Sequence, residues 1–260
     1  MIRWLPFGRK RPFLEAEAEE WQLETWRWLL QHLGPLRDHD RAPIVTPTRA
    51  FFPPSDTAGH DRAEHIFATV KRHAGMTNWE CRLVAQPRRP EARVGDIAAL
   101  QFSGGHALGT FGLAGNEVVI TYDPAGLDNP IQLIATMAHE LAHYRLAALA
   151  EEPPGGADAH EFATDLTTVY MGFGLFGASC AFNFQRYQDF MSQGWQWSRQ
   201  GYLGEREWIF ALAIFLQLRL QSPKDVIPFL KPHLATDLRK ARRYLQRNEA
   251  LLARLVARKM

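Results

Sequence analysis

An unbroken helical pattern covers residues 130–150, and the rest of the chain has to pack around it. Pro130 suits the first turn of a helix, and Asp128 or Asn129 can cap that turn. Apolar side chains recur through this stretch, and no further breaker comes before the Pro-Gly-rich residues 151–156. We therefore expect a buried helix that ends at a loop and lines a cleft.

The two halves of the chain differ in their expected elements. Helical patterns cover residues 14–33 and 61–74, and strand patterns cover residues 79–86 and 118–122. After residue 128 the patterns are almost all helical, at 130–150, 157–184, 205–220 and 223–258. The sequence thus predicts an α+β fold in which a small sheet precedes a mainly helical C-terminal half.

The chain is long enough to form one folded unit with two lobes. It has 260 residues, of which 46% are apolar and 22% charged, so it can bury a sizeable core without disulfides. We expect a sheet-bearing lobe over about residues 1–150 and a helical lobe over residues 157–260. This composition excludes a disordered chain and a disulfide-stapled miniprotein.

A possible metal site lies inside the expected helix at 130–150. Its sequence His139-Glu140-Leu141-Ala142-His143 puts two histidines four residues apart, on the same helix face. Both imidazoles can then reach one metal ion, for which zinc is the best fit, with the Glu140 carboxylate beside it. The alternative for this short motif is a histidine pair on a helix surface.

A catalytic zinc ion needs a third protein ligand and one open position. Glu161 stands 18 residues after His143 in the next expected helix, and Asp165 follows four residues later on the same face. This spacing predicts Glu161 as the third ligand and Asp165 as a carboxylate that orients a histidine ligand. His160 competes for the ligand position, but adjacent helical residues point about 100° apart, and Glu161 has Asp165 as its partner.

A strand is expected at residues 116–122, just ahead of the helix that carries the two histidines. An edge strand beside such a helix can bind an extended peptide through main-chain hydrogen bonds. We therefore expect this strand at the edge of the small sheet, next to the metal site.

With these features the chain resembles the zincin metallopeptidases, and within them the gluzincin group, in which HExxH is joined by a downstream glutamate. The residues that carry the resemblance are His139, Glu140, His143, Glu161 and Asp165. The resemblance implies that His139, His143 and Glu161 bind Zn²⁺ in a zincin-like fold. It also implies that Glu140 is the general base and that Asp165 orients a histidine. The substrate would then be a peptide or protein.

Other residues limit or extend this resemblance. The metzincin group is excluded, because its further glycine and histidine would fall at Leu146 and Leu149. Arg145 departs from the zincin pattern, which usually has an apolar residue there. By residue type alone, a second donor to the oxyanion could be one of three residues, and the sequence does not choose among them: Tyr170, Tyr202 and His233.

A zinc-binding regulatory or interaction protein without hydrolytic activity is the alternative function. Glu140 argues against it, because a structural zinc site has no use for that carboxylate and would close its fourth position with cysteine or histidine.

The charge of the chain is uneven. Its net charge is +2, yet residues 231–260 carry nine basic and two acidic side chains. Such a stripe could bind nucleic acid or an anionic membrane. Apolar residues recur along it at helical spacing, however: Leu234, Leu238, Ala241, Leu245, Leu252 and Leu255. We therefore expect a packed helix with a solvated basic face and no nucleic-acid partner, while membrane association and the oligomeric state stay open.

The compartment is expected to be the cytoplasm. The only two cysteines, Cys81 and Cys180, form no disulfide framework, and residues 1–20 lack the apolar stretch of a secretory signal. The uncharged residues 166–185 contain too many glycines and polar residues for a membrane span. They fit a buried helix broken at Gly172 or Gly174.

Overall fold

The computed structural model describes residues 12–36, 43–87, 108–115, 117–189 and 202–256, and this part of the chain has an α+β fold. Its helices are α1 (Ala16–Leu33), α2 (Gly59–His73), α3 (Pro130–Ala147), α4 (His160–Thr168), α5 (Gly174–Asp189), α6 (Glu205–Leu218), α7 (Pro232–Arg247) and α8 (Glu249–Val256). Its strands are β1 (Arg82–Ala85), β2 (Gly109–Ala114) and β3 (Glu117–Tyr122). The predicted order, a small sheet followed by helices, is confirmed for these residues.

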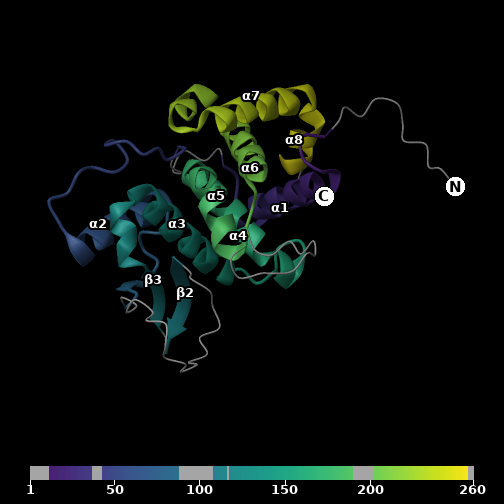
Figure 1. Ribbon diagram of the computed structural model, residues 1–260. Helices are drawn as coiled ribbons and strands as arrows, with labels where there is room; N and C mark the ends of the chain where they lie inside the picture. The colour runs from purple at the N-terminus through teal and green to yellow at the C-terminus, as the bar shows by residue number, and fades with distance from the viewer. Residues whose placement is uncertain (1–11, 37–42, 88–107, 116, 190–201, 257–260) are drawn as a thin grey trace.

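Helix α3 begins as the sequence predicts. Pro130 is its first residue, and the Asn129 side chain caps it by accepting a hydrogen bond from the backbone N–H of Gln132. The helix ends at Ala147, three residues before the predicted end. In Figure 1, α3 lies between the sheet and the central helices, and it contacts β2, β3, α4 and α5.

The sheet corrects one prediction. Its strand order is β1-β3-β2, with β1 parallel and β2 antiparallel to β3. The predicted edge strand is therefore β3, which occupies the centre, and Asn116 lies outside the described residues. The edge strand next to α3 is β2, whose sequence has two glycines in six residues and so gives a weak strand signal.

The helix predicted at 157–184 is divided into two. Between α4 and α5 lies a π-helical turn, Val169–Phe173, in which Gly172 has a φ of 96°. Only glycine adopts that conformation readily, and the Gly172 carbonyl accepts a hydrogen bond from Val45 N–H at 2.9 Å. The predicted break at Gly172 is confirmed.

The prediction of one long helix at 223–258 is wrong in two respects. Two short 3₁₀ turns, Pro223–Asp225 and Ile227–Phe229, come first, and then Asn248 separates α7 from α8. Residues 257–260 lie outside the described part. The predicted apolar seam is present: Leu234, Leu238, Ala241, Leu245 and Leu255 are buried, and Leu252 is partly buried.

Helix α6 is the centre of the helical half. Its residues 208–216 are all buried, as expected for a helix that is apolar all round. It packs against α5 on one side and α7 on the other, while α8 packs against α1 (Figure 1). Among the described residues, no helix combines the length and the apolar character that a membrane crossing requires.

Candidate metal centre

Helices α3 and α4 pack side by side and bring the predicted ligands together. His139 and Glu140 on α3 are buried, and His143 on α3 and Glu161 on α4 are partly buried. One donor atom from each of His139, His143 and Glu161 lies within 4.8 Å of the other two, the one such group in the described part of the chain.

The spacing of these donors fits a tetrahedral ion. His139 Nε2 lies 3.1 Å from His143 Nε2 and 3.2 Å from Glu161 Oε2, and His143 Nε2 lies 3.4 Å from Glu161 Oε2. Ligands about 2.05 Å from a zinc ion at tetrahedral corners are about 3.3 Å apart. Two imidazole nitrogens and a carboxylate oxygen are also the donor types that zinc prefers. The residues present therefore fit a zinc ion.

Asp165 holds His139 from the side opposite the donor group. His139 Nδ1 donates to Asp165 Oδ1 at 3.1 Å, and Asp165 Oδ2 accepts from the Leu203 N–H at 2.8 Å. Burial would lower the pKa of His139, but the hydrogen bonds to Asp165 and Glu161 raise it to about 10. Burial would likewise raise the pKa of Glu161, and the two histidines hold it well below its usual range instead.

The Glu140 carboxylate is held between α3 and β2. Burial raises its pKa, an effect that His139, His143 and a hydrogen bond from the Phe111 N–H partly offset. Strand and helix approach closely at Gly109, where a Cβ atom would lie 3.2 Å from Glu140 Cγ and 2.7 Å from Thr136 Cγ2. The strand β2 thus orients Glu140 directly, which the sequence analysis did not anticipate.

Of the three candidates for a second donor, the structure brings only Tyr202 to the site. Its ring centroid lies 5.3 Å from that of His139, and burial and the nearby carboxylates raise the pKa of its hydroxyl. Tyr170 instead donates to the backbone oxygens of Leu33 and Gly34, and His233 pairs with Glu205 on the surface.

His160, the competing ligand, stacks on His143 with ring centroids 5.5 Å apart and stands outside the donor group. Arg145 points away from the centre: its guanidinium lies over the Trp79 ring at 5.6 Å and bonds the Gly75 carbonyl. This orientation explains how α3 tolerates a charged residue at that position.

The chain matches no protein-family model, no curated protein and no solved structure.

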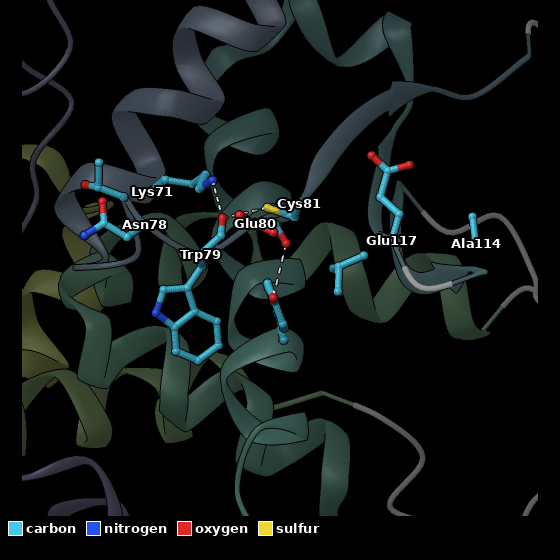
Figure 2. Close-up of a pocket in the computed structure, with 10 residues that line it drawn as sticks. Lys71, Asn78, Trp79, Glu80, Cys81, Ala114 and Glu117 are labelled. Atoms are coloured by element: carbon cyan, nitrogen blue, oxygen red, sulfur yellow. Dashed lines mark hydrogen bonds between the residues drawn. The ribbon is translucent and has the colours of Figure 1, made fainter.

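A pocket of about 1040 Å³ lies beside Tyr144, the residue that follows His143 on α3. The Phe111 ring stacks on His143, with centroids 6.5 Å apart, and on Tyr144, with centroids 5.6 Å apart; Tyr144 lines this pocket. Figure 2 shows Trp79 and its neighbours on one side of the pocket and the hairpin residues Ala114 and Glu117 on the other. The strand β2 thus leads from Phe111 at the metal centre to Ala114 at the pocket.

Proposed function

We propose that the protein is a zinc-dependent metallopeptidase with a zincin-like fold. The observation that carries this proposal is the convergence of three donor atoms at 3.1–3.4 Å, with the buried Glu140 carboxylate beside them. A structural zinc site would have no need for the Glu140 carboxylate beside the three donors.

His139, His143 and Glu161 would hold the ion, which when bound activates water and polarises a carbonyl group. Glu140 is the general base: it takes a proton from the attacking water and passes it to the leaving amine. Its raised pKa suits this role, because a base is most effective when its pKa lies near the working pH. Tyr202, whose ring centroid lies 5.3 Å from that of His139, is the proposed hydrogen-bond donor to the developing oxyanion.

The edge strand supports a peptide or protein as the substrate. Within the described residues β2 pairs with β3 on one side only, so its other edge is available to an extended chain next to Glu140. Such a chain would run from the metal centre toward the pocket at Trp79. We further propose that residues 1–260 act as one unit with two lobes, and that it works in the cytoplasm, where the free thiols of Cys81 and Cys180 are stable.

A zinc-binding regulatory protein without hydrolytic activity is the alternative. In this alternative the same three residues bind zinc as in the peptidase, but Glu140 has no catalytic role. One set of measurements therefore separates the two functions.

The test starts with the zinc content of the purified chain after dialysis against a weak chelator, followed by hydrolysis of an unfolded protein or a peptide library. We expect about one zinc per chain and cleavage that stops on metal removal and returns with added zinc. A folded chain that binds no zinc would overturn the proposal.

The variant Glu140→Gln isolates the proposed base. It should lose nearly all hydrolysis and keep its zinc, because Glu140 is not among the three donors. Glu249→Gln, an exposed position on α8, is the control and should keep both properties. A zinc-loaded parent with no cleavage of any peptide would favour the regulatory alternative.

A further inference from the structure

His143, the second histidine of the proposed zinc centre, is held by Thr164, a residue that the sequence pattern did not single out. Thr164 lies on α4 and is fully buried. Its Oγ1 is 3.3 Å from His143 Nδ1 and 2.9 Å from the backbone oxygen of His160.

The direction of both hydrogen bonds follows from the number of hydrogens. A threonine hydroxyl has one hydrogen to donate, and a backbone carbonyl oxygen can only accept. The Thr164 hydrogen therefore goes to the His160 oxygen, and the hydrogen of the other bond belongs to His143 Nδ1. We assign this tautomer from the hydrogen-bond network.

This tautomer is the one that a metal ligand needs. With its hydrogen on Nδ1, His143 has a lone pair on Nε2. That nitrogen faces the other two donors, at 3.1 Å from His139 Nε2 and 3.4 Å from Glu161 Oε2. Thr164 thus does for His143 what Asp165 does for His139, with a neutral hydroxyl in place of a carboxylate.

One helix face supplies all three of these contacts. Glu161, Thr164 and Asp165 stand at positions i, i+3 and i+4 of α4, which lie next to one another on a helix surface. Helix α4 therefore provides one ligand and both of the groups that orient the histidines of α3.

We propose that Thr164 is a positioning residue of the zinc centre, whose hydroxyl accepts the His143 Nδ1–H and so directs Nε2 at the metal. This inference rests on the proposed function, because it concerns a ligand of the zinc ion. It goes beyond the ligand set by naming the residue that fixes the second histidine.

The test compares the zinc affinity of full-length Thr164→Val and Thr164→Ser with that of the parent, by competition with a chromogenic chelator. Valine has the same shape without the hydroxyl, and we expect it to weaken zinc binding about tenfold or more. Thr164→Ser keeps the hydroxyl, and its zinc affinity should stay within about twofold of that of the parent. The visible absorption of the cobalt-substituted protein should change for valine and not for serine.

Thr168→Val is the matched control. Thr168 is also buried on α4, and its hydroxyl donates to the Thr164 backbone oxygen at 3.0 Å, one turn beyond the ligands. This variant removes the same kind of hydrogen bond and should bind zinc like the parent. Thr164→Ala replaces the valine variant if that one does not fold.

The outcomes are distinct. Unchanged zinc affinity in Thr164→Val would refute the role of Thr164 and leave the zinc centre intact. Equal weakening in Thr164→Val and Thr168→Val would show a structural effect of threonine loss, and it would also refute the role. A parent that binds no zinc would overturn the proposed function and this inference with it.

Discussion

At the scale of single residues, the two histidines of the centre are held in different ways. His139 is buried between two carboxylates, Asp165 and Glu161, whereas His143 is partly exposed and bonded to a neutral hydroxyl. A carboxylate partner makes an imidazole a stronger electron donor than a hydroxyl does. We therefore expect the groups around the proposed zinc ion to contribute unequally to its affinity. Loss of a direct ligand should weaken zinc binding more than loss of a residue that orients a ligand.

A ranking of zinc affinities tests this order. Glu161→Ala removes a donor atom and should weaken binding more than Asp165→Ala, which leaves all three donors and is expected to cost about 10-fold to 100-fold. The measurement is the zinc dissociation constant of each purified variant. Asp158→Ala, an exposed acidic position just ahead of α4, is the control and should bind like the parent. The reverse order of Glu161 and Asp165 would mean that ligand and orienting residue are exchanged.

The residues that the sequence could identify are those whose spacing lies within one or two helices. His139 and His143 share a face of α3, and Glu161 and Asp165 share a face of α4, so helical periodicity was enough to place them. Phe111 and Tyr202 reach the site through tertiary packing, from a strand and from the segment before α6. No local pattern marks them. Thr164 had a local signal, its position three residues after Glu161, but threonine is common in helices for other reasons.

At the scale of elements, the position of β2 decides how Glu140 is presented. The sequence predicts the edge strand at residues 116–122 because that strand comes just ahead of the helix with the two histidines. In the structure this strand is β3, and it lies in the centre of the sheet. Strand β2 occupies the edge instead, and Gly109 allows it to approach α3 and β3 closely. A strand of this kind is recognised only when its partners are known.

Gly109→Ala tests this close approach. The added Cβ would meet Thr121 O and Thr136 Cγ2 at 2.7 Å, so β2 must shift away from β3 and α3. We expect the free energy of unfolding to fall by about 1–3 kcal/mol, as measured by urea denaturation. Since Glu140 depends on β2, hydrolysis should fall by about tenfold or more while zinc stays bound.

The control lies on the same strand. At Gly112 nothing lies within 4 Å of an added Cβ, so Gly112→Ala should leave stability and activity close to those of the parent. Equal effects of the two substitutions would show that β2 does not depend on a close approach at Gly109.

At the scale of the whole molecule, α7 and α8 join the end of the described chain to its beginning. Helix α7 covers α6, and α8 packs on α1, where Arg254 forms an ion pair with Glu20. Tyr244 also donates to Glu19 at 2.6 Å, and the same carboxylate accepts from the Phe13 N–H. The basic residues Arg239, Lys240, Arg243 and Arg247 lie on the exposed side of this packed helix. Most of what α7 contributes should therefore be stability, through its apolar side.

Two substitutions at neighbouring positions of α7 test separately what its apolar side and its basic side contribute. Leu238 is fully buried on α7, the helix that packs on α6, so Leu238→Ala should lower the free energy of unfolding by about 2–5 kcal/mol. Arg239 is exposed, and Arg239→Ala should change it by no more than about 0.5 kcal/mol. Urea denaturation of the zinc-free proteins measures both values without a contribution from metal binding. Hydrolysis by the folded fraction should be the same in the two variants, since neither residue is among those of the metal centre. A large loss of activity in a stable Arg239→Ala protein would contradict this division and would show that the basic side takes part in substrate binding.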